Sequence, residues 1–380
     1  MVASDMIWRM VKTVKAANRM CVIPALCVCA FLSLASPSLR KPQGSPSITP
    51  GPKPADAPTE WKQLVGVYLD EPKSLAPDAK PTRSFILLED SGKLLWRDDK
   101  GAARPLSLKG DNVFLPSEGP LQVVHSIVRG EGGNVNAICY LNFCYVRTDA
   151  GADPSHPFQL TPSRPIKTLR QEALAASPPA EKGPFRNPEL IELTKLDPAI
   201  HLDIRYATTN DFVGTPVYTQ ARAFLQRPAA EALVRALHKL QPLGYGLLIH
   251  DAYRPWYVTK IFWDATPAEG KIFVADPSQG SRHNRGCAVD LTLYDLATGK
   301  PIEMPGTYDE MSPRSFPDYP GGTSLQRWHR DLLRRAMESE GFTVYEHEWW
   351  HFDYKDWREY PILNIKFEDL HSGQGLASAK

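Results

Sequence analysis

Two short segments in the second half of the chain carry residues that could hold a metal ion and hydrolyse a bond. SRHNRGCAVD contains His283 and Asp290, and EHEWWHF contains His351 with Glu348 three residues before it. Two imidazoles and one carboxylate around a Zn2+ ion leave a fourth position open for water, which is the arrangement of a hydrolytic zinc site. We therefore expect His283, Asp290 and His351 to bind one Zn2+ per chain and Glu348 to act as the general base.

The spacing within these segments raises two further points. Alternation along CAVDLTL places Cys287 and Asp290 on opposite faces of a strand, so Cys287 is expected to be a small buried side chain rather than a thiolate ligand. A regular strand would also place Glu348 and His351 on opposite faces, which predicts a bulge, twist or turn within EHEWWHF. The same alternation places His347 on the face of His351 and makes it a rival ligand.

A third segment, HDAYRPW, supplies Arg254 at the end of an apolar run. A guanidinium in the same cleft would stabilise the oxyanion that forms when water attacks a carbonyl group. The alternative is a structural ion pair with Asp251 or Asp264. The indoles of Trp349 and Trp350 are expected to wall the pocket and exclude water, and we expect Trp350 to contact the substrate.

The elements that must position these residues lie between residues 189 and 370. Apolar runs of strand length occur with amphipathic helical patterns but without the regular βαβ order of a parallel sheet. The pattern therefore predicts an α+β domain with a central, mainly antiparallel sheet flanked by helices. The last helix should begin after the capping residue Thr323 and end at Gly341. The expected strands are IHLDIRYAT, YGLLIHDAY and CAVDLTLYD, and the expected helices are RPAAEALVRALHKL and TSLQRWHRDLLRRAMESEGF.

The first 60 residues have the composition of a targeting segment followed by a tether. Basic residues precede an apolar run, CVIPALCVCAFLSLA, which is short for a membrane span and ends in small residues. We expect residues 1–35 to be a signal peptide that is cleaved after Ala35, which predicts a periplasmic or secreted protein with no stable membrane insertion. An uncleaved N-terminal membrane anchor is the alternative. Residues 36–60 are rich in proline and poor in aliphatic residues, which predicts an extended, mobile tether.

The middle of the chain shows a different pattern. Residues 61–162 contain short apolar runs with period-two patterning between turn signals, which predicts a small all-β domain whose role the sequence does not indicate. Residues 163–188 are rich in proline and polar residues apart from a short helical pattern, TLRQEALAA, and are expected to link two domains. In an oxidising compartment Cys139 and Cys144 can pair if a turn or hairpin separates them, and the sequence leaves this pairing open.

The overall composition is that of a globular protein. The chain has 380 residues, of which 42% are hydrophobic and 23% charged, and it is long enough for two domains with cores of their own. Its 44 basic and 43 acidic residues give a formal net charge of +1. Such a balance provides no global field to attract nucleic acid or an anionic membrane. We therefore expect no nucleic-acid partner, and the sequence does not specify an oligomeric state.

Four segments together resemble a known family. VADPSQGSRHNRGCAVDLTLYDLATGK, EHEWWHF, HDAYRP and DIRYATTNDFVGTPVY are similar to motifs of the D-alanyl-D-alanine dipeptidases, and they occur in the family's order. These zinc enzymes belong to the clan of the penicillin-insensitive D,D-carboxypeptidases, the lysostaphin-type peptidases and the hedgehog signalling domain. The resemblance covers about residues 189–360, and it implies a C-terminal zinc-peptidase domain.

The resemblance also implies roles for individual positions. Its zinc ligands match His283, Asp290 and His351, its catalytic base matches Glu348, and its transition-state arginine matches Arg254. Ser281 falls where the family has a serine near the substrate. Asp309, in GTYDEM, aligns with an acidic residue that binds the ammonium group of the dipeptide.

The implied reaction is zinc-dependent hydrolysis of D-Ala-D-Ala, or of a closely related short D-peptide, with release of D-alanine in cell-wall peptide metabolism. A D,D- or L,D-carboxypeptidase or endopeptidase that acts on longer stem peptides of peptidoglycan is the alternative among enzymes. A non-catalytic, zinc-containing cell-wall-binding module is the alternative from another class. Residues 36–185 have no counterpart in the resemblance.

Overall fold

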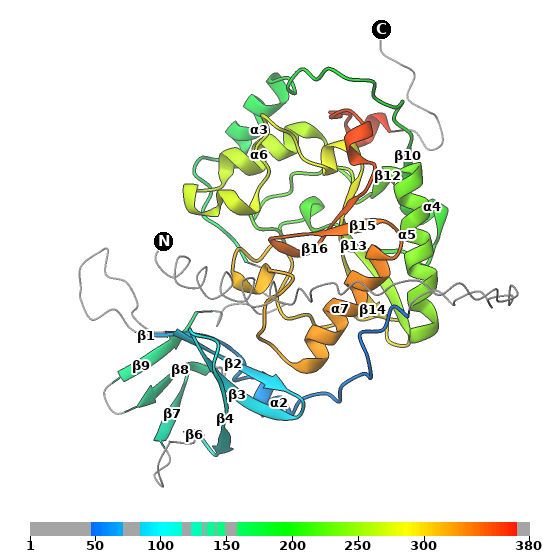
Figure 1. The fold of residues 1–380 in the computed structure, drawn as a ribbon. Coiled ribbons are helices and arrows are strands. Elements are labelled where there is room, and N and C mark those ends of the chain that lie inside the picture. Colours follow the sequence, from blue (N-terminus) through cyan, green and yellow to red (C-terminus); the bar gives the residue numbers. More distant parts are fainter. Residues whose placement is uncertain are drawn as a thin grey trace, which may run out of the picture.

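The computed structural model describes residues 47–70, 84–115, 123–130, 133, 135–140, 143–148 and 158–370, which form a β sheet and a larger α+β body (Figure 1). The expected signal peptide and the first part of the expected tether, residues 36–46, lie outside the described residues. Within the described ranges, no helix has both the length and the apolar character needed to cross a membrane.

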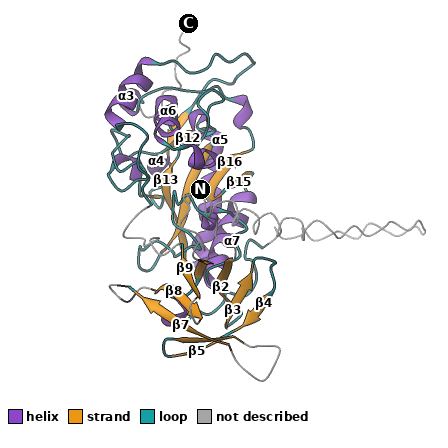
Figure 2. Ribbon diagram, turned by 90° about the vertical axis from the view of Figure 1, so that its left-hand side faces the viewer, coloured by secondary structure: helices purple, strands orange, loops and turns teal. Residues whose placement is uncertain are grey.

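The described part of the smaller body is a nine-stranded antiparallel sheet in the order β4-β3-β2-β1-β9-β8-β7-β6-β5, preceded by the short helix α2 (Thr59–Lys62). It lies below the larger body in Figures 1 and 2. Alternate side chains of its strands enter one core, in which Tyr68, Leu87 and Ile138 are fully buried. The strands are β1 (Gly66–Asp70), β2 (Ser84–Asp90), β3 (Lys93–Asp98), β4 (Ala103–Pro105), β5 (Ser107–Lys109), β6 (Asn112–Leu115), β7 (Val123–Arg129), β8 (Val135–Tyr140) and β9 (Phe143–Arg147).

A disulfide joins β8 and β9. Cys139 and Cys144 lie directly opposite each other in this antiparallel pair, which brings the two sulfur atoms within bonding distance. The structure therefore resolves the pairing that the sequence left open, because β8 and β9 are neighbouring antiparallel strands.

The larger body contains a five-stranded sheet in the order β11-β13-β14-β16-β15. β11 is parallel to β13 and the other pairs are antiparallel, so the mixed α+β class is confirmed. Only the start of IHLDIRYAT is a strand, because Arg205–Ala207 forms a 3-10 turn that places Tyr206 in the core. The strands of this sheet are β11 (His201–Leu202), β13 (Tyr245–Asp251), β14 (Ala288–Asp295), β15 (Phe342–Tyr345) and β16 (Glu348–Tyr354); β10 (Leu190–Glu192) and β12 (Phe224–Gln226) form a separate pair.

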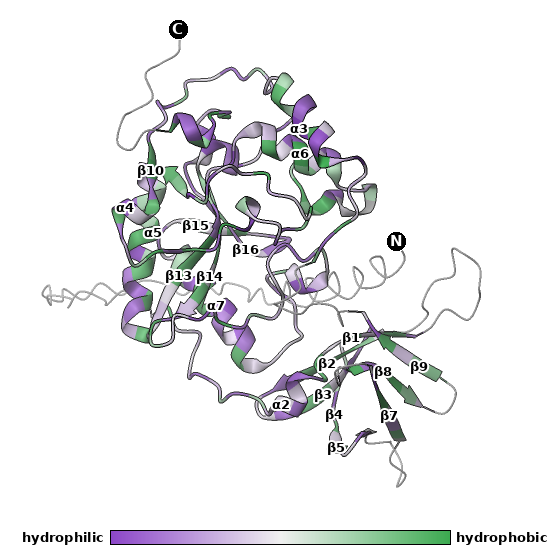
Figure 3. Cartoon of the chain, turned by 180° about the vertical axis from the view of Figure 1, so that it is seen from behind, coloured by the Kyte–Doolittle hydropathy of each residue, from purple (hydrophilic) through white to green (hydrophobic). Residues whose placement is uncertain are grey.

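Helices flank this sheet, and the two predicted ones begin where the sequence indicates, although the second ends at Glu338, three residues before Gly341. α5 (Arg227–Leu240) has proline in its first turn, and α7 (Ser324–Glu338) has a capping box in which the Thr323 hydroxyl accepts a hydrogen bond from the backbone of Gln326. Gly341 follows α7 with a φ of +88°, a conformation that favours glycine. α5 packs on β13, and α7 packs on β14, β15 and β16 (Figure 3). The remaining α-helices in the described part of this body are α3 (Ile166–Ala175), α4 (Leu193–Leu196) and α6 (Trp256–Ala265).

The region expected to link two domains instead forms part of the larger body. α3 lies beside α6 (Figure 1), and its side chains Ile166, Leu169 and Ala173 are buried in the same core as the central sheet. Their spacing of three and four residues gives one apolar helical face. Glu181, further along the expected linker, accepts hydrogen bonds from Arg285 and from the backbone of Ile362 at 2.5 and 2.6 Å. The linker prediction was therefore wrong for residues 166–181.

This packing predicts a difference between two leucines of α3. Replacing Leu169, which is fully buried, with alanine should lower the free energy of unfolding by about 2–5 kcal/mol, because it leaves a cavity. Replacing Leu174, which is 46% exposed, should change it by less than about 0.5 kcal/mol. Urea denaturation of both variants tests this, and equal midpoints would contradict the packing of α3.

The described part of the expected tether also lies against the larger body rather than apart from it. Ile48 packs on the core, and the carbonyl of Gly51 accepts a hydrogen bond from the indole of Trp328 at 3.1 Å. The ammonium of Lys53 lies 5.3 Å from the ring centroid of Tyr245. This segment is the blue trace that runs to α2 in Figure 1. Its prolines give an extended backbone, but its few larger side chains find partners on the body.

The two bodies meet where β2 approaches the start of α7. The buried side chain of Glu89 accepts hydrogen bonds from the backbone and the hydroxyl of Ser324 at 2.7 and 3.3 Å. The backbone N–H of Glu89 donates to the carbonyl of Gly322 at 3.1 Å, and Arg327 donates to the carbonyl of Glu89 at 2.8 Å. Tyr319 packs on the same side into a small apolar cluster with β1 and β2. The sheet is thus fixed to the loop that precedes α7.

Candidate metal centre

A tight turn brings His283 back over the strand that carries Asp290. The short 3-10 turn His283–Arg285 ends at Gly286, which has a φ of +66°. A Cβ atom at Gly286 would lie 2.5 Å from the side chain of Leu190, so both the conformation and the space require glycine. The next residues enter β14, where Asp290 lies opposite His351 of β16.

Two irregularities in the sheet add further groups to this face. The register of β13 and β14 shifts after Ile249, so that Asp251 rather than His250 lies opposite Asp290. The register of β15 and β16 shifts between Val344 and Tyr345, which lets Glu348 approach the same site as His351. The irregularity that the sequence predicted within EHEWWHF is therefore confirmed.

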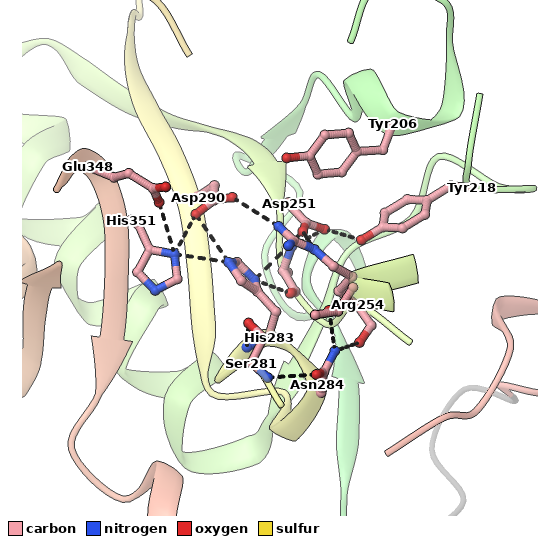
Figure 4. Close-up of polar contacts among 12 residues, drawn as sticks. Tyr206, Tyr218, Asp251, Arg254, Ser281, His283, Asn284, Asp290, Glu348 and His351 are labelled. Carbon is pink, nitrogen blue, oxygen red and sulfur yellow. Dashed lines mark hydrogen bonds and ion pairs between the residues drawn. The ribbon is translucent and has the colours of Figure 1, made fainter. Parts of the chain in front are cut away.

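Three ligand atoms converge at the centre of this face (Figure 4). The Nε2 atom of His283 lies 3.0 Å from Nδ1 of His351 and 3.3 Å from Oδ1 of Asp290, and the latter two atoms are 3.0 Å apart. All three side chains are buried. Ligand atoms about 2.0–2.1 Å from a tetrahedral ion would lie about 3.3 Å from one another, so the group has nearly the dimensions of one face of such a site.

The outer nitrogen of each histidine has its own acceptor. Nδ1 of His283 lies 2.6 Å from the carbonyl of Ala252, and Nε2 of His351 lies 2.9 Å from the carboxylate of Asp353. If these outer nitrogens carry the protons, the two inner nitrogens face each other as lone pairs, a contact that only a cation or an added proton relieves. The donor set therefore fits a divalent metal ion.

The histidines also determine the charge of Asp290. Burial alone would raise the pKa of this carboxyl, but the adjacent His283 and His351 bring the pKa well below its ordinary value. Its second oxygen accepts a hydrogen bond from the hydroxyl of Tyr308 at 3.1 Å and lies 3.7 Å from the guanidinium of Arg254. These contacts favour the ionised form of Asp290 and fix its orientation from both sides.

Glu348 lies next to the three ligands without belonging to their group. Its Oε2 atom is 3.8 Å from Nδ1 of His351, and both residues line the same cavity. Burial raises the pKa of Glu348 to about 8, and the charge of Asp290 acts in the same direction, although His351 lowers it. A carboxylate beside a metal site and facing a cavity has the placement of a general base.

Arg254 both makes the expected ion pair and faces the cavity. Its Nε donates to Asp251 at 2.8 Å, while Tyr218 donates to the other oxygen of Asp251 at 2.6 Å. The guanidinium carbon lies 5.0 Å from the ring centroid of Phe262 and 5.3 Å from that of Tyr206. The two interpretations of Arg254 are thus compatible, because the pair with Asp251 holds the guanidinium beside the ligand Asp290 (Figure 4).

A cavity of about 670 Å3 opens over the ligands and is also lined by the three residues expected to contact substrate, Ser281, Asp309 and Trp350. The Ser281 hydroxyl accepts a hydrogen bond from the backbone of His283 at 3.2 Å, so it also stabilises the turn that carries this histidine. Trp350 is 2% exposed and walls the cavity, with its ring 5.6 Å from that of Tyr308.

Asp309, in the wall of this cavity, has an unusual backbone conformation and an incompletely bonded carboxyl group. It has a φ of +59°, and Tyr206 donates a hydrogen bond to its Oδ1 at 3.1 Å. No described residue bonds to its buried Oδ2 atom. Burial raises the pKa of this carboxyl well above its ordinary value, and the charges of Asp290 and Glu348 add to the effect. Such a strained and incompletely paired carboxylate is typical of a ligand contact.

Two other predictions concern residues outside the ligand group. His347 lines the cavity, but its Nδ1 lies 3.1 Å from the hydroxyl of Tyr345, and within the described ranges it is not among the residues that could hold a metal ion together. Cys287 is fully buried and free, and burial raises the pKa of its thiol, so it is the inert core residue that strand alternation predicts.

Four functional positions did not follow from motif spacing. Asp353 orients His351, Tyr308 orients Asp290, and Tyr206 and Tyr218 hold Asp309 and Asp251. Asp353 has a sequence signal, because it lies two residues after a candidate ligand on the same strand. The tyrosines come from distant segments and had no such signal.

The arrangement defines a class of hydrolytic enzyme, the mononuclear metallopeptidases, in which two histidines and a carboxylate hold the metal beside a glutamate. The family described as D-ala-D-ala dipeptidase matches residues 186–370. The D-alanyl-D-alanine dipeptidase of Escherichia coli is 35% identical over 179 residues, which are 47% of this chain and 91% of the relative. The chain therefore belongs to the D-alanyl-D-alanine dipeptidase family.

Further relatives carry the same name. The D-alanyl-D-alanine dipeptidase of Enterococcus faecalis is 36% identical over 196 residues, covering 45% of this chain and 95% of the relative. That of Streptomyces coelicolor is 35% identical over 175 residues, covering 41% and 87%. The family match begins at residue 186 and therefore leaves the N-terminal sheet outside it.

The ligand geometry predicts which histidines bind metal. His283→Ala and His351→Ala should each lose the bound metal ion, whereas His347→Ala should retain it, because His347 lies outside the group. Asp353→Ala should weaken metal affinity about 10- to 100-fold by removing the acceptor that orients His351. Elemental analysis of dialysed protein and competition with a chelator measure both effects. Loss of metal in the His347 variant alone would overturn the assignment.

Proposed function

We propose that this protein is a zinc dipeptidase that hydrolyses D-Ala-D-Ala or a closely related short D-peptide and releases D-alanine. The observation that carries the proposal is the convergence of the metal-ligand group, Glu348 and Arg254 on one cavity. The names of the relatives support the substrate, since each is called a D-alanyl-D-alanine dipeptidase. Two imidazoles and one carboxylate support Zn2+ as the metal, because such a set is common to catalytic zinc sites.

The amino end of the substrate would lie against Asp309. Its unbonded carboxylate oxygen offers a partner for an ammonium group, and the hydroxyl of Tyr206 holds the other oxygen in place. Burying an ammonium without such a partner would be costly. This feature supports a substrate with a free amine, as a dipeptide has, over one whose amino side continues into a longer chain.

The reaction then follows from the positions of the side chains. When bound, zinc supplies a Lewis acid that polarises the scissile carbonyl and makes water a stronger nucleophile at neutral pH. Glu348 takes a proton from the attacking water and later delivers it to the nitrogen of the leaving D-alanine. Arg254 donates to the oxyanion that develops on the carbonyl. Trp350 covers this part of the cavity and limits the access of bulk water.

Removing the base tests the reaction. Glu348→Gln should lower kcat for D-Ala-D-Ala about 10²- to 10⁴-fold, because an amide cannot accept the proton from water. Glu346→Gln is the matched control, since Glu346 is exposed and lies two residues away. Release of D-alanine by the zinc-loaded enzyme measures both. An unchanged rate in the Glu348 variant, with full metal content, would contradict the assignment of the base.

A second candidate activity is cleavage of longer stem peptides by the same site. The cavity of about 670 Å3 supports it, because pockets of about 300–1,000 Å3 enclose ligands much larger than a dipeptide of alanine. The position of Asp309 favours the dipeptide. The two activities differ in the length of the peptide substrate and use the same chemistry.

Asp309 distinguishes the two activities. Asp309→Asn should raise KM for D-Ala-D-Ala about tenfold or more, because the ammonium loses a charged partner. The same substitution should leave the turnover of a pentapeptide ending in D-Ala-D-Ala unchanged, since that substrate has no ammonium at this position. If the native enzyme released D-alanine from the pentapeptide faster than from the dipeptide, the longer peptide would be the substrate.

We also propose that the protein works outside the cytoplasm, in cell-wall peptide metabolism. The apolar segment near the N-terminus supports export through a cleavable signal peptide, with a retained membrane anchor as the alternative. The disulfide between Cys139 and Cys144 is consistent with an oxidising compartment. N-terminal sequencing of the mature protein distinguishes the cleaved from the anchored form.

A further inference from the structure

A second cavity lies between the two bodies. Its volume is about 340 Å3, and its walls come from both sides of the interface. Lys62, Val65, Gly66 and Arg147 line it from the N-terminal body, whereas most of the remaining wall comes from β14, β16 and the loop before α7. Because the first four residues lie outside the segment matched by the dipeptidases, this cavity belongs to the architecture of the present chain.

Buried polar atoms in this wall lack partners. The hydroxyl of Thr292 and the indole N–H of Trp349 belong to side chains that are 5% and 3% exposed, and neither atom bonds to any described residue. Leaving a buried donor unsatisfied costs about 1–3 kcal/mol. Thr292 and Trp349 lie on neighbouring strands, β14 and β16, and both line the cavity. A polar ligand at this cavity would give both atoms a partner.

The wall offers one guanidinium fork to an anion. Its formally charged residues, among those described, are Lys62, Arg147, Arg205, Arg314 and Glu303. Lys62 is paired with Asp56 at 2.7 Å, and Arg314 is paired with Glu310 at 3.2 Å. Arg205 donates through Nε to Asp203 at 3.1 Å, and no described residue accepts a hydrogen bond from its two terminal amino groups. A guanidinium presents these groups as a fork that matches a carboxylate.

Part of the remaining wall is apolar, which limits the kind of anion. The side chains of Pro301, Ile302, Met304 and Pro305 line the cavity together with the ring of Tyr308. An inorganic ion would leave this surface in contact with water, whereas a small organic acid would cover it. The volume accommodates a molecule of the size of an amino-acid derivative.

We propose that this cavity is a second binding site, for a small organic carboxylate such as an N-acylated amino acid or the end of a short peptide. The carboxylate accepts hydrogen bonds from Arg205, Trp349 and Thr292, and the organic part lies on the apolar wall. Tyr308 lines the cavity with its ring and donates its hydroxyl to Asp290, so the ligand would lie one side chain away from the metal centre.

Binding of N-acetyl-D-alanine to the full-length, zinc-loaded protein tests this site. In a protein with 15N-labelled indoles, the Trp349 resonance, assigned by its absence from a Trp349→Phe variant, should shift saturably with the ligand. Thr292→Val should weaken binding about tenfold, because it removes a hydrogen bond to a charged group. Thr292→Ser should restore affinity, and Thr343→Val on the exposed face of β15 should leave it unchanged.

Three results would overturn the proposal. One is the absence of a saturable shift of the Trp349 resonance, which would mean that the cavity holds water only. Another is equal affinity in the native protein and in both Thr292 variants. The last is equally tight binding of inorganic phosphate, which would contradict an organic ligand. Because Thr292 is outside the proposed catalytic machinery, its variants should keep their D-Ala-D-Ala turnover whether or not the second site exists.

Discussion

Two imidazole nitrogens that face each other at 3.0 Å, with a carboxylate oxygen beside both, impose the constraint on which the rest of this structure depends. Left to themselves, three such electron-rich atoms would hydrate or separate. They stay together because each side chain is held from behind, His283 by the Ala252 carbonyl, His351 by Asp353 and Asp290 by Tyr308. The turn at Gly286 and the register shifts between β13 and β14 and between β15 and β16 place these side chains on one face.

The residues that do chemistry could be predicted from the sequence because their types are rare and their spacing is local. His283 and Asp290 are joined by one turn and one strand, and Glu348 and His351 share a strand. Alternation gave the correct environment for Cys287. Alternation could not show which of His347 and His351 is the metal ligand. The irregular stretch of β16 does not follow the period-two pattern on which that prediction depends. The supporting tyrosines depend on contacts between distant segments, which no local pattern encodes.

Some parts of the fold could likewise be predicted from the sequence and others could not. α5 and α7 could be predicted because proline, the threonine cap and the terminal glycine mark their ends. The roles of residues 47–58 and 166–181 could not, because a proline-rich composition specifies backbone extension but not whether a surface is available to bind it. Leu169 and Ile48 find that surface on the larger body. A short apolar face therefore occurs both in segments that pack on a folded body and in linkers. Which of the two forms depends on whether another surface of the protein is available to cover that face.

The contact between Glu89 and the start of α7 has a thermodynamic consequence for the whole chain. The loop held there by the N-terminal sheet also carries Tyr308 and Asp309, so the sheet and the metal centre share one segment of backbone. A metal ion or substrate that binds only the native site adds its binding free energy to every part that unfolds with that site. Metal binding would then protect the distant sheet from proteolysis, and mutations that destabilise the sheet would lower the affinity for the metal. Because the loop before α7 contacts both the N-terminal sheet and the metal centre, a change in its conformation at one contact alters the other. The two bodies therefore behave as one cooperative unit.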